Sequence, residues 1–351
     1  MFGKKQNVIG LDIGSHTIKI LQVEEKDSRL KLLNLGVIPI PREAFGEGRV
    51  TQPEQLSHCI QRLVSHLKIK DKDVSCAVSG YEVMIKKLEL PTMTDEELRV
   101  RMQSELRQYI PYNVEEVDVD YQILGLTKDR LNFMDVLLVA SKKDSIRDYV
   151  RLIQSSQLQT AVLDVDFFAL CNAFEVTHGF PEKETIVLLD IGATKALMSI
   201  VDRGVPVFTR GLSIGGAQIT EKIRQVLRNS YDEAERIKLG ERSENVSRNE
   251  LKDIFTSTVR NWVGECKRAI DFYYSNYPET KIEKVFLSGG SCNIPGLDQV
   301  FQENMDMIVK IFNPLADITY DSKVFDPDYL NHVGPQMAIV LGLALRKANE
   351  K

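Results

Sequence analysis

The chain has 351 residues, of which 43% are hydrophobic and 27% charged, so it can bury a sizeable core in two or three domain-sized units. Its formal net charge of −5 comes without any block of Lys or Arg, which argues against a nucleic-acid-binding protein. Five scattered cysteines without CxxC spacing favour a reducing cytoplasm over a disulfide framework or zinc site, and the sequence contains no run of the ~18 uncharged apolar residues that a membrane-spanning helix needs.

The first predicted element is a hairpin near the N-terminus. A short β-branched run ends in Asp12-Ile13-Gly14-Ser15, and an alternating run follows. Gly14 indicates a tight turn between two strands, and small residues at such a turn let backbone N–H groups approach an anion. Hydroxyl groups and one lysine complete the pattern. It predicts a phosphate-binding hairpin made of Gly14, Ser15, His16, Thr17 and Lys19.

The next segment predicts a helix and then an insertion. Residues 53–69 carry an apolar helical face, and 73–80 is typical of a strand. Between 84 and 160 strand and helix patterns alternate, and Thr94 with Glu97 has the spacing of a helix-capping box. This stretch is long enough to form a small subdomain of its own.

The second half opens with a near copy of the first hairpin. A buried run ends in Asp190-Ile191-Gly192-Ala193-Thr194, with Lys195 closing the turn. One such hairpin would most simply be an ordinary turn that begins with an aspartate, but two near copies favour a duplicated phosphate site. We therefore predict that Gly192, Ala193 and Thr194 bind phosphate. Two carboxylates beside phosphate require a hard cation, so Asp12 and Asp190 predict Mg²⁺ held through water.

Glycine-rich turns follow in the second half. Gly215-Gly216 leads into a helix, and Ser288-Gly289-Gly290 follows a strand. At the second turn the backbone could lie flat against a nucleotide. Between the two turns, Glu235 and Lys238 stand three residues apart on a predicted helix, a spacing that is also common for an ordinary surface ion pair.

In this order the motifs resemble the actin-like ATPase superfamily, which includes actin, Hsp70, MreB and FtsA. The resemblance implies an α/β protein with a duplicated actin-like ATPase (ribonuclease H-like) fold around one ATP–Mg²⁺ cleft. It also implies a set of adenosine-binding residues: Gly215, Gly216, Glu235, Lys238, Gly289, Gly290 and Ser291.

Some positions depart from the superfamily pattern. Ala193 replaces a common glycine, so the second turn is less permissive. Asp166, with Asp164 close by, stands where relatives carry a water-orienting glutamate. Because aspartate is one methylene shorter, we expect slow hydrolysis with Asp166 as the candidate catalytic residue. The alternative is that both aspartates cap the following helix.

The position of the insertion resembles that in FtsA and implies an FtsA-type inserted subdomain. The segments "MFGKKQNVIGLDIGS" and "ELRQYIPYNVEEVDVDYQILG" are similar to the PilM family, cytoplasmic actin-like proteins of type IV pilus assembly. This resemblance implies binding of the N-terminal cytoplasmic tail of PilN, and peripheral attachment to the inner membrane through such partners. The alternatives are a filament-forming cell-division protein, against which the ending "ALRKANEK" counts because it lacks a bulky apolar face, and a small-molecule kinase.

The resemblance implies four subdomains. We predict a first actin-like subdomain, an inserted subdomain, a second actin-like subdomain and a small nucleotide-capping subdomain. Their expected residues are, in that order, 1–83 with 161–184 and 330–351; 84–160; 185–215 with 272–329; and 216–271.

Overall fold

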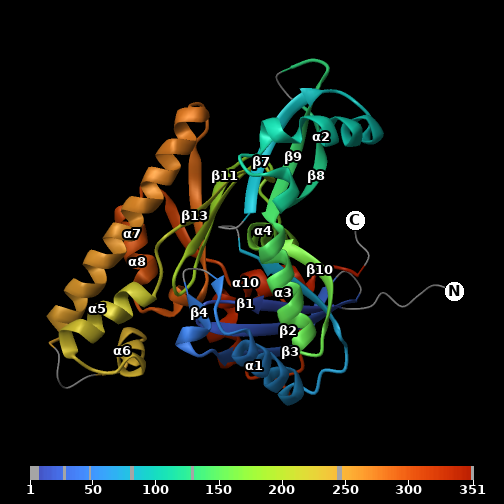
Figure 1. Cartoon of the computed structure of the whole chain (residues 1–351). Helices are drawn as coiled ribbons and strands as arrows, with labels where there is room; N and C mark the ends of the chain where they lie inside the picture. The colour runs from blue at the N-terminus through green and yellow to red at the C-terminus, as the bar shows by residue number, and fades with distance from the viewer. Residues whose placement is uncertain are drawn as a thin grey trace.

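The computed structural model describes residues 8–26, 29–46, 49–79, 83–127, 130–242 and 247–348. Figure 1 shows two halves side by side, each built on a sheet, with a smaller sheet above the first half. Gly80, the end of one predicted strand, and the ends of the chain at 1–7 and 349–351 lie outside the described residues. Within the described part, no helix combines the length and the apolar character that crossing a membrane requires.

The sheet of the first half has the strand order β10-β6-β1-β2-β3. In it, β1 pairs antiparallel with β2 and parallel with β6, and β2 pairs antiparallel with β3. The strands are β1 (Ile9–Ile13), β2 (Thr17–Lys26), β3 (Arg29–Pro39), β6 (Asp73–Val78) and β10 (Gln159–Val165).

The sheet of the second half repeats this topology. Its order is β13-β12-β11-β14-β15, so β11 takes the place of β1, with β12 antiparallel and β14 parallel to it. The strands are β11 (Thr185–Ile191), β12 (Ala196–Asp202), β13 (Val205–Leu212), β14 (Ile282–Ser288) and β15 (Ile308–Ile311). The predicted duplication of the fold is therefore confirmed.

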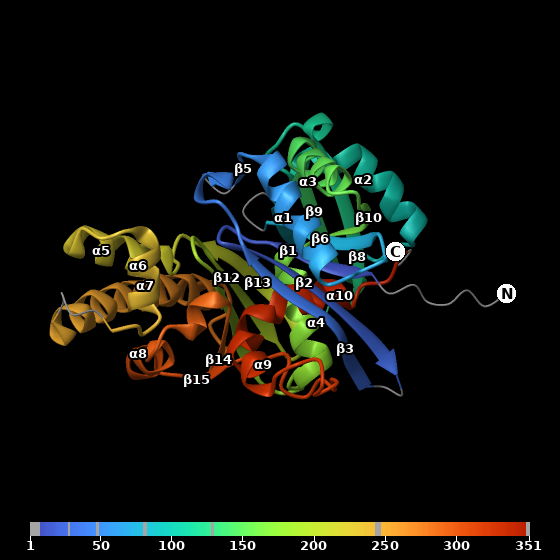
Figure 2. The ribbon, with the colours of Figure 1, turned by 90° about the horizontal axis from the view of Figure 1, so that it is seen from below.

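Helices cover both faces of the first sheet. The outer helices α1 (Pro53–His66) and α3 (Lys143–Ser155) share one hydrophobic cluster with β1 and β6. On the other face lie α4 (Asp166–His178) and α10 (Ala338–Ala344), which Figure 2 shows between the two sheets. Gly10 permits this packing, because a Cβ there would lie 2.5 Å from the carbonyl oxygen of Val340.

The two halves share part of their core. One cluster combines side chains of β2 and β3 with residues of α4, α10 and the second sheet, including Ile186 and Leu188 of β11. The halves are therefore joined by apolar packing along one side, which leaves the opposite side, where the two hairpin turns lie, free to form a cleft.

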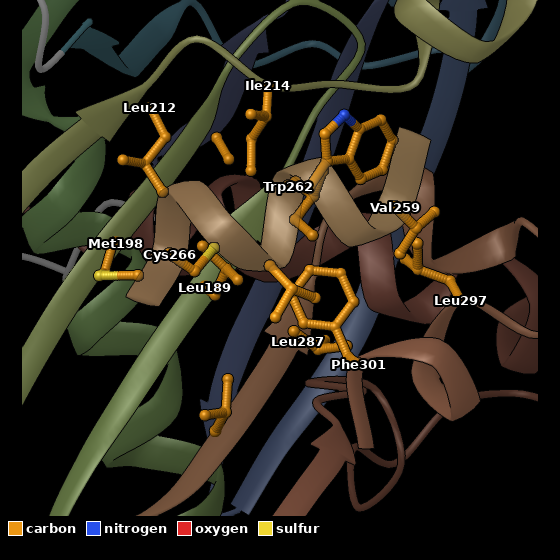
Figure 3. Close-up of a cluster of buried hydrophobic side chains, with 14 of the residues drawn as sticks. Leu189, Met198, Leu212, Ile214, Val259, Trp262, Cys266, Leu287, Leu297 and Phe301 are labelled. Carbon is orange, nitrogen blue, oxygen red and sulfur yellow. The ribbon is translucent and has the colours of Figure 1, made fainter. Parts of the chain in front are cut away.

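The second half has a separate core, in which the long helix α7 (Arg248–Asn276) packs against the second sheet. Trp262 of α7 is buried, and the cluster drawn in Figure 3 contains it together with residues of the sheet and of α8. The neighbouring helices are α5 (Ala217–Leu227), α6 (Tyr231–Lys238) and α8 (Leu297–Asn304). The short elements are η1 (Arg42–Ala44), β4 (Phe45–Gly46), β5 (Arg49–Val50), η4 (Gly290–Asn293), α9 (Pro327–Val333) and η5 (Gly334–Met337).

The insertion forms a three-stranded sheet, β7-β9-β8, with its own core under α2. Its elements are β7 (Val83–Pro91), α2 (Asp95–Tyr109), η3 (Val114–Glu116), β8 (Val117–Leu126) and β9 (Phe133–Lys142). The predicted capping box is confirmed, because Thr94 Oγ1 accepts from the backbone N–H of Glu97 at 3.3 Å and Glu97 Oε2 accepts from that of Thr94 at 2.8 Å.

The last part of the predicted 84–160 insertion packs against the first half. Tyr149, Leu152 and Ile153 of α3 belong to the cluster beneath the first sheet, and β10 pairs with β6. We therefore propose that the inserted subdomain ends near Lys142. The other predicted subdomain boundaries remain predictions.

Candidate functional site

The two hairpin turns have the same closing hydrogen bond. The backbone N–H of Gly14 donates to Thr17 O at 3.0 Å, and that of Gly192 donates to Lys195 O at 2.9 Å. The turns also meet across the two halves, because Thr194 Oγ1 donates to Ser15 Oγ at 2.9 Å. The duplicated motif therefore produces two small-residue turns that face each other, as a shared phosphate site would require.

A cleft of about 340 Å³ lies between the halves at these turns. It is lined by elements of both halves, including nearly all the residues that the sequence predicted for a nucleotide site. Those that line it are Asp12, Gly14, Ser15, His16, Thr17, Lys19, Asp166, Asp190, Gly192, Ala193, Thr194, Gly216, Glu235, Lys238, Gly290 and Ser291.

Gly215 and Gly289 do not line the cleft but support its wall. A Cβ on Gly215 would lie 2.4 Å from Ala193 O, and one on Gly289, whose φ is +91°, would lie 2.4 Å from Ile191 O. Both glycines therefore let a loop pack against the second hairpin. Ser291 Oγ strengthens this wall by donating to Gly192 O at 2.8 Å.

The phosphate end of the cleft concentrates charge. Lys19 Nζ pairs with Asp12 Oδ2 at 2.7 Å, while Asp190 is only 8% exposed and accepts a hydrogen bond from Ser288 Oγ at 2.8 Å. The pKa of Asp190 is raised to about 6, mainly by burial and in smaller part by the charges of Asp12 and Asp166, which together outweigh the lowering effect of Ser288 and Lys19. A cation in this position would relieve the cost of ionising Asp190.

The donor set fits a magnesium ion that keeps much of its water. In the described ranges no three His, Cys, Asp or Glu side chains converge into a complete metal site. Asp12 and Asp190 nevertheless supply hard carboxylate oxygens to the same cleft. Mg²⁺ usually takes one or two carboxylates and fills its octahedron with water and substrate phosphate oxygens.

Asp166 is the first residue of α4 and is 5% exposed. Its Oδ1 accepts from the backbone N–H of Phe167 at 2.9 Å, and its Oδ2 lies 3.6 Å from Lys195 Nζ. Asp164 does not line the cleft and pairs with Arg346 at 3.5 Å. Neither aspartate occupies the N-cap position, which is Val165, but each accepts a hydrogen bond from a backbone N–H at the start of the helix, Asp164 from Val165 and Asp166 from Phe167.

Glu235 and Lys238 form a pair at 2.5 Å in the wall of the cleft. Thr220 Oγ1 donates to Glu235 Oε2 at 2.6 Å, and a Cβ on Gly216 would lie 3.1 Å from Lys238 Nζ. The Lys238 side chain is only 6% exposed, and burial lowers its pKa. This i,i+3 pair is therefore not an ordinary surface pair but part of the cleft wall.

His16 of the first half lies close enough to Glu235 and Lys238 to be influenced by their charges. Burial lowers the pKa of His16, while Glu235 raises it and Lys238 lowers it. The side chain therefore experiences charges from α6, although His16 belongs to the first hairpin. Its predicted contact with phosphate remains a prediction.

Several lining residues were not assigned from the sequence. Lys195 occupies the position in the second turn that Thr17 holds in the first, and this correspondence could have revealed it. Asn293, His332 and Gln336 come from segments without a local motif and reach the cleft only through tertiary packing.

A contact between the halves also involves the segment before β4. The guanidinium of Arg42 lies 3.6 Å from the centroid of the Tyr231 ring. Arg42 belongs to η1 in the first half, and Tyr231 begins α6 in the second. Phe45, which follows η1, and Lys238, the last residue of α6, both line the cleft. The cation–π contact therefore links two segments that lie on opposite sides of the cleft.

Residues 10–348 match the family described as type IV pilus assembly protein PilM. The chain belongs to the PilM family. The cell division protein FtsA of Enterococcus faecalis is 23% identical over 87% of this chain and 78% of its own length. FtsA of Bacillus subtilis is 21% identical over 93% of this chain and 82% of its own length. This PilM-family chain therefore also resembles FtsA along most of its length.

Solved structures agree with this fold. A PilM-PilN type IV pilus biogenesis complex contains a chain with a TM-score of 0.85 and 24% identity, covering 98% of this chain and 99% of that one. MreB5 of Spiroplasma citri bound to ADP has a TM-score of 0.51 and 11% identity, with coverages of 96% and 94%. At these identities the similarity supports an actin-like fold for this PilM-family member.

Proposed function

We propose that this chain is an ATP–Mg²⁺-binding scaffold of type IV pilus assembly, whose nucleotide state is coupled to its attachment to PilN and to twitching motility. The observation that carries the nucleotide part is the convergence of the two matching hairpins on one cleft, with Asp12, Lys19 and Asp190 in its wall. Membership of the PilM family supports the assignment to pilus assembly.

The lining residues would bind different parts of the nucleotide. The two turns would bind phosphate oxygens through backbone N–H groups, and Lys19 would add a positive charge. Asp12 and Asp190 would hold Mg²⁺ through water, where the ion neutralises phosphate charge. Other lining residues would bind adenosine: Gly216, Glu235, Lys238, Gly290 and Ser291, with Gly215 and Gly289 supporting their loops.

The architecture suggests how nucleotide binding acts on the whole molecule. The halves are packed together along one side and carry complementary parts of the cleft on the other. A ligand that contacts both halves favours one angle between them. Asp166 would orient a water for hydrolysis, and because its side chain is one methylene shorter than a glutamate, we expect an activity that is slow at most.

The first test measures Mg–ATP affinity by isothermal titration calorimetry. Asp12→Ala and Lys19→Ala each remove one partner of a charge pair in the cleft, so we expect a loss of about 30-fold or more. Lys284→Ala is the matched control, because Lys284 pairs with Glu184 at 2.5 Å away from the cleft. Binding by both cleft variants as tight as in wild type would contradict the phosphate site.

We propose that the junction between the insertion and the first half binds the PilN tail. A neighbour in the PilM-PilN complex has the same fold, which supports PilN as the partner. The junction contains a cavity of about 370 Å³ lined by β5, η3 and the start of α3. Strand β7 does not contribute to this cavity. An extended peptide could bind there through backbone contacts and side-chain pockets.

The partner test removes the insertion without removing α3. Val83 and Ser141 are paired on neighbouring strands, so a short Gly-Ser linker can replace residues 84–140. We expect this variant to lose binding of a PilN tail peptide in fluorescence polarisation and to keep Mg–ATP binding. If it retains both, the partner site lies elsewhere.

A further inference from the structure

Lys195 connects the two halves inside the cleft. Its backbone closes the second turn by accepting from the N–H of Gly192. Its side chain crosses to the first half, where Nζ contacts Ser79 Oγ and lies 3.6 Å from Asp166 Oδ2. Ser79 follows β6 and Asp166 begins α4, so this one side chain reaches the ends of two elements of the other half.

The two lysines of the phosphate end are held differently. Lys19 pairs with Asp12 of its own hairpin at 2.7 Å, within the range of a charge-assisted hydrogen bond. The 3.6 Å between Lys195 and Asp166 exceeds that range, so their attraction is that of an ion pair without a short hydrogen bond. The attraction of Lys195 to Asp166 is therefore weaker than that of Lys19 to Asp12, although Lys195 Nζ also contacts Ser79 Oγ.

The charges around Lys195 favour a turn of this side chain toward another anion. Asp12, Asp166 and Asp190 all line the cleft, and Lys19 and Lys195 oppose them at the phosphate end. An ammonium on a flexible four-carbon stem can change partners by rotating side-chain bonds. A terminal phosphate carries more negative charge than one carboxylate and would compete for Lys195 with Asp166.

We propose that Lys195 exchanges Asp166 for the terminal phosphate of a nucleoside triphosphate, so that the cleft distinguishes triphosphate from diphosphate. The inference rests on the proposed nucleotide site and adds the residue that reads the terminal phosphate. A diphosphate lacks that group and leaves Lys195 with Asp166. With ADP bound, the contact of Lys195 with Asp166 of the other half is then retained. With ATP bound, a contact of Lys195 with the terminal phosphate replaces it.

The test compares affinities for Mg–ATP and Mg–ADP by isothermal titration calorimetry. Lys195→Met keeps most of the stem and removes the charge. We expect about 10-fold weaker binding of ATP, with ADP changed less than about 3-fold, because one charged contact to phosphate is lost. Lys195→Arg should keep most of the preference, and Lys284→Ala should leave both affinities unchanged.

Asp166→Asn supplies a second measurement. Removing the competing carboxylate should strengthen ATP binding severalfold in the wild-type background and less in Lys195→Met, since the variant has no ammonium to release. Thermal unfolding verifies that each variant is folded, and Lys195→Gln replaces Lys195→Met if the latter is not. An unchanged ATP-to-ADP affinity ratio in the folded Lys195 variant overturns the inference, whereas wild-type protein that binds neither nucleotide overturns the proposed function itself.

Discussion

Asp190→Asn should make the protein more stable at neutral pH while it damages the nucleotide site. Asp190 is almost completely buried, and its pKa is raised from its ordinary 3.8 to about 6 mainly by burial. The folded state therefore disfavours the ionised Asp190 carboxylate more than the unfolded state does. The shift of roughly 2 pKa units corresponds to a cost of about 3 kcal/mol once the carboxyl is ionised in both the folded and the unfolded state.

The pH dependence follows from the direction of the shift. Below about pH 4 the carboxyl is protonated in both states and contributes no difference. Between about pH 4 and pH 6 the folded state binds more protons than the unfolded state, so the free energy of unfolding falls as pH rises. Above pH 6 the full cost is present. Asparagine has no such titration and can still accept the hydrogen bond from Ser288 Oγ.

Urea unfolding at pH 4.5 to 7.5, without nucleotide, measures this effect. The free energy of unfolding of Asp190→Asn minus that of wild type should rise by up to about 3 kcal/mol across this range. Asp306→Asn is the control, because the Asp306 side chain is fully exposed. The free energy of unfolding of this variant should stay within about 0.5 kcal/mol of wild type across the pH range. A difference that does not vary with pH would refute the assignment of a buried, costly charge to Asp190.

Three further predictions concern the cleft wall. Lys238→Ala should weaken ATP binding while leaving competition by pyrophosphate unchanged in calorimetry, since we propose that Lys238, which lines the cleft, contacts the nucleoside; an equal loss of both ligands would exclude a nucleoside contact. Arg42→Ala removes the cation–π contact with Tyr231 and should speed release of a fluorescent ATP analogue about 2- to 5-fold in stopped flow; an unchanged rate would show that this contact does not restrain the cleft. Gly289→Ala should lower the free energy of unfolding by about 2 kcal/mol or more because its Cβ would lie 2.4 Å from Ile191 O, whereas Gly290→Ala, whose nearest such neighbour is at 4.0 Å, should have little effect; similar losses would refute the packing explanation.

In the inserted region the sequence pattern predicted local hydrogen bonds but not which sheet a helix packs against. The capping box at Thr94 was predictable because both of its hydrogen bonds join residues three positions apart. The apolar face of α3 was equally visible, but periodicity does not specify which sheet a helix covers. Its packing beneath the first sheet is the reason we propose that the insertion ends near Lys142 and not at residue 160.

The sequence by itself determined the two hairpins, their turns and the residue types that the turns present, because a tight turn depends on the few residues that form it. The duplicated strand order followed, since each copy carries the same pattern. Only the tertiary structure decided which groups share one cleft. It brought Lys195 to Asp166 and buried Glu235 with Lys238, because long side chains and helix faces take partners from segments far away in sequence. The pKa of Asp190 likewise depends on burial and on neighbouring charges from both halves, which exist only once the two halves have packed together.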